Sequence, residues 1–339
     1  MSISIVKNFP LEKLNTFNIS ANAKFFYEFK TLESLKEILN HNLLKTEKSF
    51  VLGGGSNILI SNDFDGIVLK NSIKGIHITK ENKNHTEVEV GSGENWHEFV
   101  LWCVKKNLSG VENLALIPGS VGASPIQNIG AYGCEAKDTI KKVEFIELES
   151  KTIKELTNSE CDFSYRSSIF KKDLKEKCII TKVTFLLNKK PINNTSYGAI
   201  ASELTTLNSQ ASPQSICKAV INIRSRKLPD PQKIGNSGSF FKNPIISNKK
   251  LKKIKEEYPE IVNYKYSQTH SKIAAGWLIE MAGWKGYRKN DFGVYDKQAL
   301  VLVNYGNASG NDIIELSKKI QRSVHKKFDI KIYPEVNII

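Results

Sequence analysis

The segment Ile117–Gly133, IPGSVGASPIQNIGAYG, constrains the fold of this chain more than any other segment. It contains four glycines and two prolines, and short polar side chains fill much of the remainder. Glycine lets the backbone bend sharply and approach a ligand closely, while proline stiffens the path and removes N–H donors. This composition suits a loop whose backbone encloses a flat or phosphorylated ligand. An ordinary turn-rich connection has the same composition, so the segment alone leaves both interpretations open.

A second glycine-rich segment lies upstream. Phe50–Asn57, FVLGGGSN, leads from a short apolar strand into three consecutive glycines. Successive exposed N–H groups in such a loop can bind an anion, typically a phosphate. A Rossmann fingerprint would need G-x-G-x-x-G followed by a helix. Here a strand (58–60), a turn (61–66) and another strand (67–70) follow, which argues against that motif.

Length and hydropathy indicate a cytoplasmic globular protein. The 339 residues predict two or three domains. No apolar run is long enough to span a membrane, and the N-terminus lacks the layout of a signal peptide, so we expect no membrane insertion. Five widely spaced cysteines without a C-x-x-C pair are typical of reduced thiols, and we expect no metal site.

The net charge of +14 raises the question of a nucleic-acid partner. Nucleic-acid-binding proteins usually gather such charge on one face or in one run, whereas the lysines here are dispersed. We therefore expect no nucleic-acid partner. A basic field also helps to capture polyanionic small molecules.

Hydrophobic periodicity in the first half of the chain predicts a mixture of strands and helices. Thr31 is a suitable cap for a helix with an apolar face. A second helix should run from about 95 to 107, with His97 on its exposed side. Strands are predicted at 75–79, 86–91, 143–148 and 178–187.

The second half of the chain begins with a polar stretch, 188–212, which we expect to be a mobile loop with a short helical piece. The helix predicted at 272–283 should bury Trp277 and Met281 along one face. Further helices are predicted at 249–258 and 313–328, and strands at 299–304 and 332–338.

Three more motifs contain residues that could do chemistry. Arg166 lies in CDFSYRSS, Ser239 in GNSGSFFKNP, and Glu335 near the C-terminus. The glycine before Ser239 and the small residues around it allow its hydroxyl to project from a tight turn. Each also has an ordinary interpretation, because arginines in polar turns and glutamates at chain ends are usually solvated.

The two glycine-rich loops, in this order, resemble the FAD-binding half of the vanillyl-alcohol-oxidase-type flavoproteins. The later motifs resemble the UDP-N-acetylenolpyruvoylglucosamine reductase family over nearly the whole chain. These motifs are YRSS (165–168), KLPDP (227–231), GNSGSFFKNP (235–244), WKG (284–286) and PEV (334–336). The polar stretch around Tyr197 matches the longer subfamily, in which a tyrosine loop closes over the nucleotide-sugar.

The resemblance implies an α+β fold with a two-lobed FAD-binding domain and a C-terminal α/β substrate-binding domain. The lobes would comprise 1–70 and 71–226, with the tyrosine loop at 188–212. The substrate-binding domain would comprise 227–325, and the C-terminal strand that carries Glu335 would comprise 326–339.

The resemblance also implies the site residues. Catalytic roles fall to Arg166, Ser239 and Glu335, and substrate contacts to Tyr197, Lys227, Asn243, Tyr264, Lys285 and Gln298. The FAD contacts implied are Gly53, Gly54, Gly55, Ser56, Asn57, Pro118, Gly119, Ser120, Gly122, Ala123, Asn128, Gly130, Ala131, Tyr132 and Gly133.

The implied activity is reduction of UDP-N-acetylglucosamine enolpyruvate to UDP-N-acetylmuramate, a peptidoglycan precursor, with NADPH as co-substrate. Hydride would pass from flavin N5 to C3 of the enolpyruvyl group, and Ser239 would protonate C2. A monomer is expected. Two alternatives stay open at this point: a flavin oxidase of the same fold, and a basic binding protein without enzymatic activity.

Overall fold

The computed structural model describes residues 3–339 and divides them into two compact units. The first contains the residues up to Phe9, Ala23–Gly54 and Asp65–Arg226. The second contains Pro10–Asn22, Gly55–Phe64 and Lys227–Ile339. Two short segments from the N-terminal part of the chain therefore belong to the second unit.

The first unit begins with a small four-stranded sheet, ordered β1-β2-β5-β3. Strands β3 and β5 are parallel, and the connection between them carries the glycines of segment 50–57. Thr31 caps α1 through its hydroxyl, as predicted, and the helix buries Leu35, Ile38 and Leu39. The elements are β1 (Val6–Pro10), β2 (Asn22–Phe29), α1 (Leu32–Leu39), α2 (Leu43–Thr46), β3 (Ser49–Leu52) and β5 (Phe64–Asn71).

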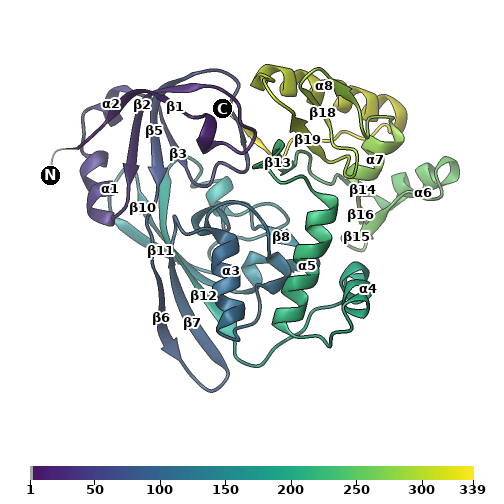
Figure 1. Cartoon of the computed structure of the whole chain (residues 1–339), viewed down its shortest axis with the longest axis horizontal. Helices are drawn as coiled ribbons and strands as arrows, with labels where there is room; N and C mark the ends of the chain where they lie inside the picture. Colours follow the sequence, from purple (N-terminus) through teal and green to yellow (C-terminus); the bar gives the residue numbers. More distant parts are fainter. Residues whose placement is uncertain (1–2) are drawn as a thin grey trace. The chain divides into compact units, whose positions relative to one another are not determined.

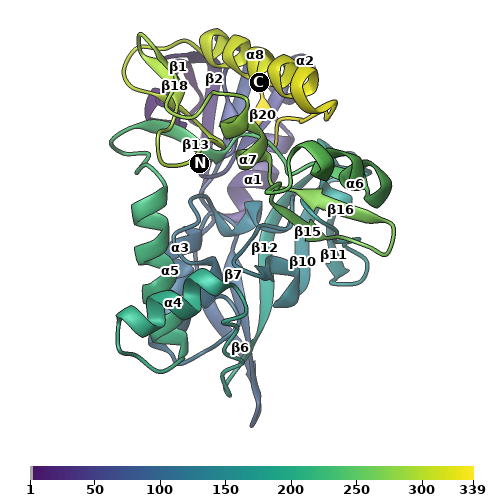
Figure 2. The ribbon, with the colours of Figure 1, turned by 90° about the vertical axis from the view of Figure 1, so that its right-hand side faces the viewer.

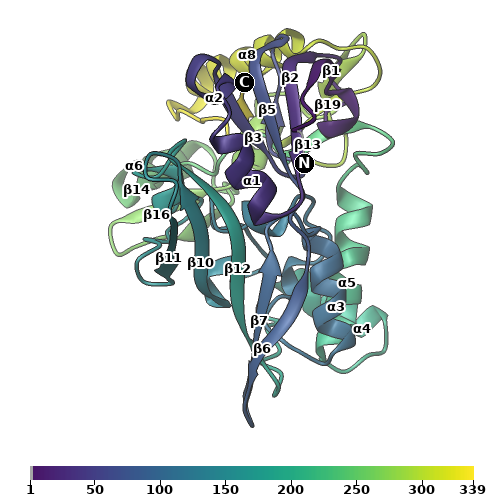
Figure 3. The ribbon, with the colours of Figure 1, turned by 90° about the vertical axis from the view of Figure 1, so that its left-hand side faces the viewer.

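A five-stranded antiparallel sheet, ordered β11-β10-β12-β7-β6, forms the larger part of this unit, and its strands lie side by side in Figure 3. Figure 1 shows α3 and α5 in the same unit. The ring of Phe99 on α3 lies 4.7 Å from that of Phe185 on β12, so the helix packs on the sheet. The elements are β6 (Ile76–Glu81), β7 (His85–Gly91), α3 (Trp96–Lys105), β10 (Ile140–Glu147), β11 (Ile153–Thr157), β12 (Cys178–Asn188), α4 (Gly198–Thr206) and α5 (Pro213–Lys227).

The second unit is built on a four-stranded sheet, β13-β19-β18-β17, and a three-stranded sheet, β14-β16-β15. Figure 2 shows α6 beside β16. The predicted stripe of α8 is buried, from Ile313 through Ile320 to Phe328. The elements are β13 (Gly235–Ser239), β14 (Ile245–Ser247), α6 (Asn248–Glu257), β15 (Asn263–Lys265), β16 (His270–Ile273), α7 (Ala275–Met281), β17 (Arg288–Lys289), β18 (Phe292–Val294), β19 (Val301–Asn304) and α8 (Gly310–Phe328).

The prediction of a helix at 272–283 was wrong about where the helix begins and about which residues it buries. Residues up to Ile273 belong to β16, and α7 begins only at Ala275. Leu278 and Ile279 are fully buried, whereas Met281 is 39% exposed. The amide of Ala275 donates to Asn243 Oδ1 at 2.9 Å. This tertiary contact supplies the acceptor that starts the helix.

The predicted final strand, 332–338, is reduced to a short β20 (Asn337–Ile338). It pairs in parallel with β4 (Ile58–Leu59), the strand that follows the glycines of segment 50–57. This pairing joins the C-terminal strand to the segment Gly55–Phe64 of the second unit.

Candidate functional site

The two glycine-rich loops contact each other inside the first unit. A Cβ added to Gly54 would lie 2.6 Å from Gly119 Cα, and one added to Gly53 would lie 2.6 Å from Ser120 Oγ. Real Cβ atoms do not approach other heavy atoms so closely, so the loops meet only because these positions are glycines. Gly53 and Gly54 therefore lie beside Gly119 and Ser120, although about 60 residues separate the two loops in sequence.

The loop of segment 50–57 has the features of an anion-binding backbone. Gly54 is exposed, and no protein acceptor within residues 3–339 is recorded for the Gly54 or Gly55 N–H group. Gly55 has φ +65°, and an added Cβ would lie 1.9 Å from the Leu14 carbonyl oxygen. Consecutive N–H groups presented in this way suit a diphosphate.

Lys70 is a cation at this loop that the sequence did not reveal. It lies opposite Leu52 in the parallel pairing of β3 and β5, and its ammonium donates to the Gly53 carbonyl. Burial lowers the pKa of Lys70 from its ordinary value. Only the register of two strands brings this lysine to the glycines, and no local motif marks it.

The second loop is attached to the short connection between β7 and α3. The amide of Val121 donates to Glu94 O, and that of Gly122 to Ser92 O, each at 2.8 Å. A Cβ on Gly122 would lie 2.5 Å from Ser92 Cβ. These contacts hold Ser120 and its neighbours in place, which is the rigidity that a binding loop needs.

Asn128 and Arg166 organise the end of this loop. Asn128 is fully buried, and its amide donates to Glu135 Oε2 at 3.0 Å and to Ser164 O at 3.2 Å. The Arg166 guanidinium donates to the Gly130 carbonyl at 2.7 Å. Arg166 itself has φ +53°, a strained backbone for a non-glycine residue that costs about 1–3 kcal/mol and occurs often at functional sites.

Tyr132 and Tyr197 are neighbours. Their rings are 5.2 Å apart in an edge-to-face arrangement, and Tyr197 is 40% exposed at the start of α4. The Asn113 side chain donates to both Tyr132 O and Asn194 O, at 3.1 and 3.0 Å. The tyrosine loop is therefore tied to the end of the 117–133 loop through Asn113, a residue that the sequence did not single out.

His97 was predicted to be exposed, which was wrong. It is half-buried, and its Nδ1 accepts a hydrogen bond from the Leu116 amide at 3.0 Å. Burial lowers the pKa of His97. The imidazole positions the residue that precedes the 117–133 loop.

In the second unit, Ser239 and Glu335 lie on adjacent segments. Ser239 is exposed at the end of β13, after Gly238 at φ +67°. The Glu335 amide donates to the carbonyl of Phe240, the residue after Ser239, at 2.8 Å. Two residues that are almost a hundred positions apart are thus brought to one place.

The side chain of Asn57 is also near Glu335. Its Nδ2 donates to Glu335 O at 3.5 Å, and its own carbonyl accepts from the Asn337 amide at 3.1 Å. The pairing of β4 with β20 is responsible for this proximity. Asn57, Ser239 and Glu335 therefore share one region of the second unit.

The remaining predicted substrate residues lie elsewhere in the second unit. Asn243 and Gln298 both lie at the first turn of α7. Asn243 Oδ1 accepts from the Ala275 amide, and Gln298 Oε1 lies 3.0 Å from the point that a Cβ added to Gly276 would occupy. Tyr264 is 44% exposed on β15, and Lys285 pairs with Glu280 at 2.8 Å. Lys227 is exposed at the end of α5.

Comparisons with known proteins decide the family. Residues 230–339 match the model for the UDP-N-acetylenolpyruvoylglucosamine reductase C-terminal domain, and residues 23–156 match an FAD binding domain. A UDP-N-acetylenolpyruvoylglucosamine reductase of Flavobacterium johnsoniae is 49% identical over 339 residues, covering 99% of this chain and 100% of the relative. The chain belongs to the UDP-N-acetylenolpyruvoylglucosamine reductase family.

Other members of the reductase family agree. The Amoebophilus asiaticus reductase is 46% identical and covers 99% of this chain and 100% of the relative. The crystal structure of the Thermus caldophilus reductase matches with a TM-score of 0.67 at 22% identity, covering 100% of this chain and 99% of that one. The predicted family and fold class are confirmed.

Proposed function

We propose that this member of the reductase family is an FAD enzyme that uses NADPH to reduce UDP-N-acetylglucosamine enolpyruvate to UDP-N-acetylmuramate. The family relationship over the full chain supports the reaction. The observation that carries the proposal is that the second unit brings exposed Ser239 beside the segment of Glu335. In the first unit, an anion-binding glycine loop packs against the 117–133 loop.

The residues of the chain fit FAD. The N–H groups of exposed Gly54 and of its neighbour Gly55 suit its diphosphate, and Lys70 adds positive charge at the same loop. When bound, FAD supplies hydride transfer between NADPH and the enolpyruvyl group. We assign it the contacts Gly53, Gly54, Gly55, Ser56, Asn57, Pro118, Gly119, Ser120, Gly122, Ala123, Asn128, Gly130, Ala131, Tyr132 and Gly133.

The proposed catalytic residues stabilise negative charge on the substrate and donate one proton to it. Addition of hydride to C3 of the substrate leaves negative charge at C2, which is delocalised into the neighbouring carboxylate. We assign the stabilisation of this charge to Arg166 as a cation and to Glu335 as a hydrogen-bond donor, since cationic and donor groups directed at developing negative charge lower the barrier. Ser239 then donates its hydroxyl proton to C2, because an enolate is a strong enough base to take it.

Binding of the nucleotide-sugar is assigned to six residues. Tyr197, at the start of α4 within the polar segment 188–212, acts as a lid, and Lys227, Asn243, Tyr264, Lys285 and Gln298 contact the substrate. We retain the domain division 1–70, 71–226, 227–325 and 326–339 as part of this proposal.

The chain should act as a cytoplasmic monomer. All five cysteines are free thiols, which suits a reducing compartment. Among residues 3–339, no helix is long and apolar enough to cross a membrane.

Ser239→Ala tests the proposal by stopped-flow absorbance of the flavin. Reduction by NADPH does not need the Ser239 proton and should keep its rate. Reoxidation by the enolpyruvyl substrate should slow by about 10²–10⁴-fold, the usual contribution of a placed acid.

Ser237→Ala is the matched control. Ser237 precedes Ser239 by two residues on the same strand, and its buried Oγ has no hydrogen-bond partner within residues 3–339. This control should reoxidise at the wild-type rate. The assignment fails if both variants slow equally, or if Ser239→Ala slows both half-reactions together.

A further inference from the structure

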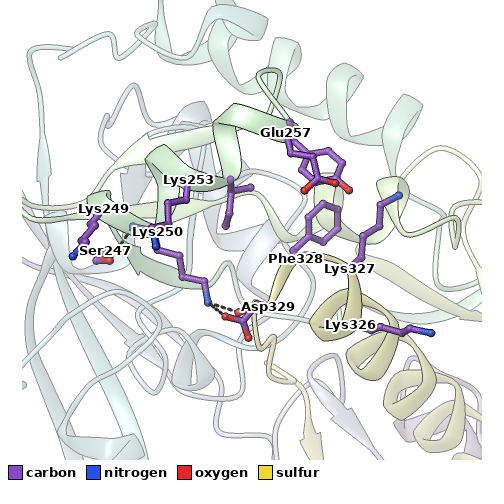
Figure 4. Close-up of a pocket in the computed structure, with 11 residues that line it drawn as sticks. Ser247, Lys249, Lys250, Lys253, Glu257, Lys326, Lys327, Phe328 and Asp329 are labelled. Atoms are coloured by element: carbon purple, nitrogen blue, oxygen red, sulfur yellow. Dashed lines mark hydrogen bonds and ion pairs between the residues drawn. The ribbon is translucent and has the colours of Figure 1, made fainter.

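A basic groove lies in the second unit between α6 and the C-terminal end of α8 (Figure 4). Its volume is about 530 Å³, which is within the usual range of ligand sites. None of the residues assigned to the reductase reaction lines it. The lining residues are Ser247, Lys249, Lys250, Lys253, Ile254, Glu257, Tyr258, Lys326, Lys327, Phe328 and Asp329.

The charge of the groove is strongly positive. Five lysines and two carboxylates line it, which leaves a net charge of +3. Lys250 pairs with Asp329 at 2.8 Å, and this pairing lowers the pKa of the Asp329 carboxyl. Within residues 3–339, Lys249, Lys253 and Lys326 form no salt bridge. These three ammonium groups are available to an anionic partner.

The floor of the groove is apolar. The rings of Tyr258 and Phe328 are 5.0 Å apart, and each also packs on Trp277. Lys327 lies 5.8 Å from the centre of each ring, beside Phe328 in Figure 4, and its ammonium donates to the Met281 carbonyl. Half-buried Ile254 completes the floor.

We propose that this groove binds an acidic segment of another protein, with an apolar side chain of that segment on the floor. Carboxylates of the segment pair with the lysines of the rim, while the apolar side chain displaces water from the half-buried Ile254 and Tyr258. The proposal goes beyond the reductase reaction and gives a role to part of the net charge of +14.

The shape of the groove favours a protein segment over two other polyanions. A membrane surface is flat and is bound by protruding apolar side chains, whereas the apolar side chains here are recessed. Single-stranded nucleic acid is bound by stacking of bases on open aromatic faces. Here the two rings pack edge-to-face against each other, Tyr258 is edge-to-face and Phe328 tilted against Trp277, and Lys327 lies over both rings.

Fluorescence anisotropy of the FAD-loaded full chain tests this assignment. The probe is a labelled glutamate-rich peptide with one central phenylalanine, and its partner probe carries serine in place of that phenylalanine. The phenylalanine peptide should bind more tightly, and its affinity should fall as salt is raised. The double variant Lys249→Glu/Lys253→Glu should weaken binding by about tenfold or more, because each substitution replaces an attraction by a repulsion.

The matched control is Lys252→Glu/Lys255→Glu, which makes the same charge change on α6 outside the groove. It should weaken binding only slightly, and both double variants should keep wild-type turnover and melting temperature. The proposal is overturned if the two double variants weaken binding equally, if the two peptides bind alike, or if neither binds. It is also overturned if a labelled oligothymidylate or phosphatidylglycerol vesicles bind through the groove lysines while the peptide does not.

Discussion

Replacing Gly54 by alanine should loosen FAD without unfolding the protein. The added methyl group would lie 2.6 Å from Gly119 Cα, 2.9 Å from Gly119 C and 3.1 Å from Ser120 N. All three neighbours are backbone atoms, so no side chain can rotate away to make room. The two glycine-rich loops must therefore move apart, and both carry proposed FAD contacts.

The size of the effect follows from the cost of overpacking. Inserting a methyl group into a tight contact costs about 1–3 kcal/mol. If this cost falls on the loop conformation that binds the cofactor, the dissociation constant of FAD rises by about 5- to 150-fold. The melting temperature of the FAD-free protein should fall by about 2–12 °C if the same cost falls on the first unit.

Titration of FAD-free protein with FAD, followed by quenching of flavin fluorescence, measures the first quantity, and circular dichroism measures the second. Gly198→Ala is the matched control, since a Cβ at that position has no heavy atom within 4 Å. Its FAD affinity should equal that of the wild type. Wild-type affinity and melting temperature in Gly54→Ala would refute the loop contact, and an equal loss in Gly198→Ala would show that the effect is not local.

Two further predictions concern the lid and the buried thiols. Tyr197→Ala should raise KM for the enolpyruvyl substrate and leave NADPH-driven flavin reduction intact, and equal damage to both in stopped-flow experiments would contradict a lid role. Burial raises the pKa of Cys161 and Cys178 to about 12, so the folded state keeps protons that the unfolded state releases. The contribution of each buried thiol to the free energy of unfolding should be complete below the ordinary thiol pKa. The free energy of unfolding should then fall as pH rises toward 12, by at most about 1.4 kcal/mol per pH unit for each thiol. Urea unfolding at several pH values measures this slope, which should be shallower in Cys161→Ala/Cys178→Ala.

Local sequence patterns predicted much of the fold. The stripe from Ile313 to Phe328 has the helical period, and it is the buried face of α8. The Thr31 cap was also predictable, because capping depends on residues three positions apart. The pattern misled at 272–283, where the amide side chain of Asn243, far from the helix in sequence, sets the point at which α7 begins.

What the sequence by itself determined was the set of motifs and, through them, the family to which the chain belongs. Their glycines carry local information, since a backbone that turns or approaches closely needs glycine whatever surrounds it. Only the tertiary structure decided which motifs meet. Lys70 reaches Gly53 through strand register, and Glu335 lies beside Phe240 through a hydrogen bond between backbone groups. Every residue other than proline carries the same backbone donor and acceptor, so no side-chain pattern marks such a pairing in advance.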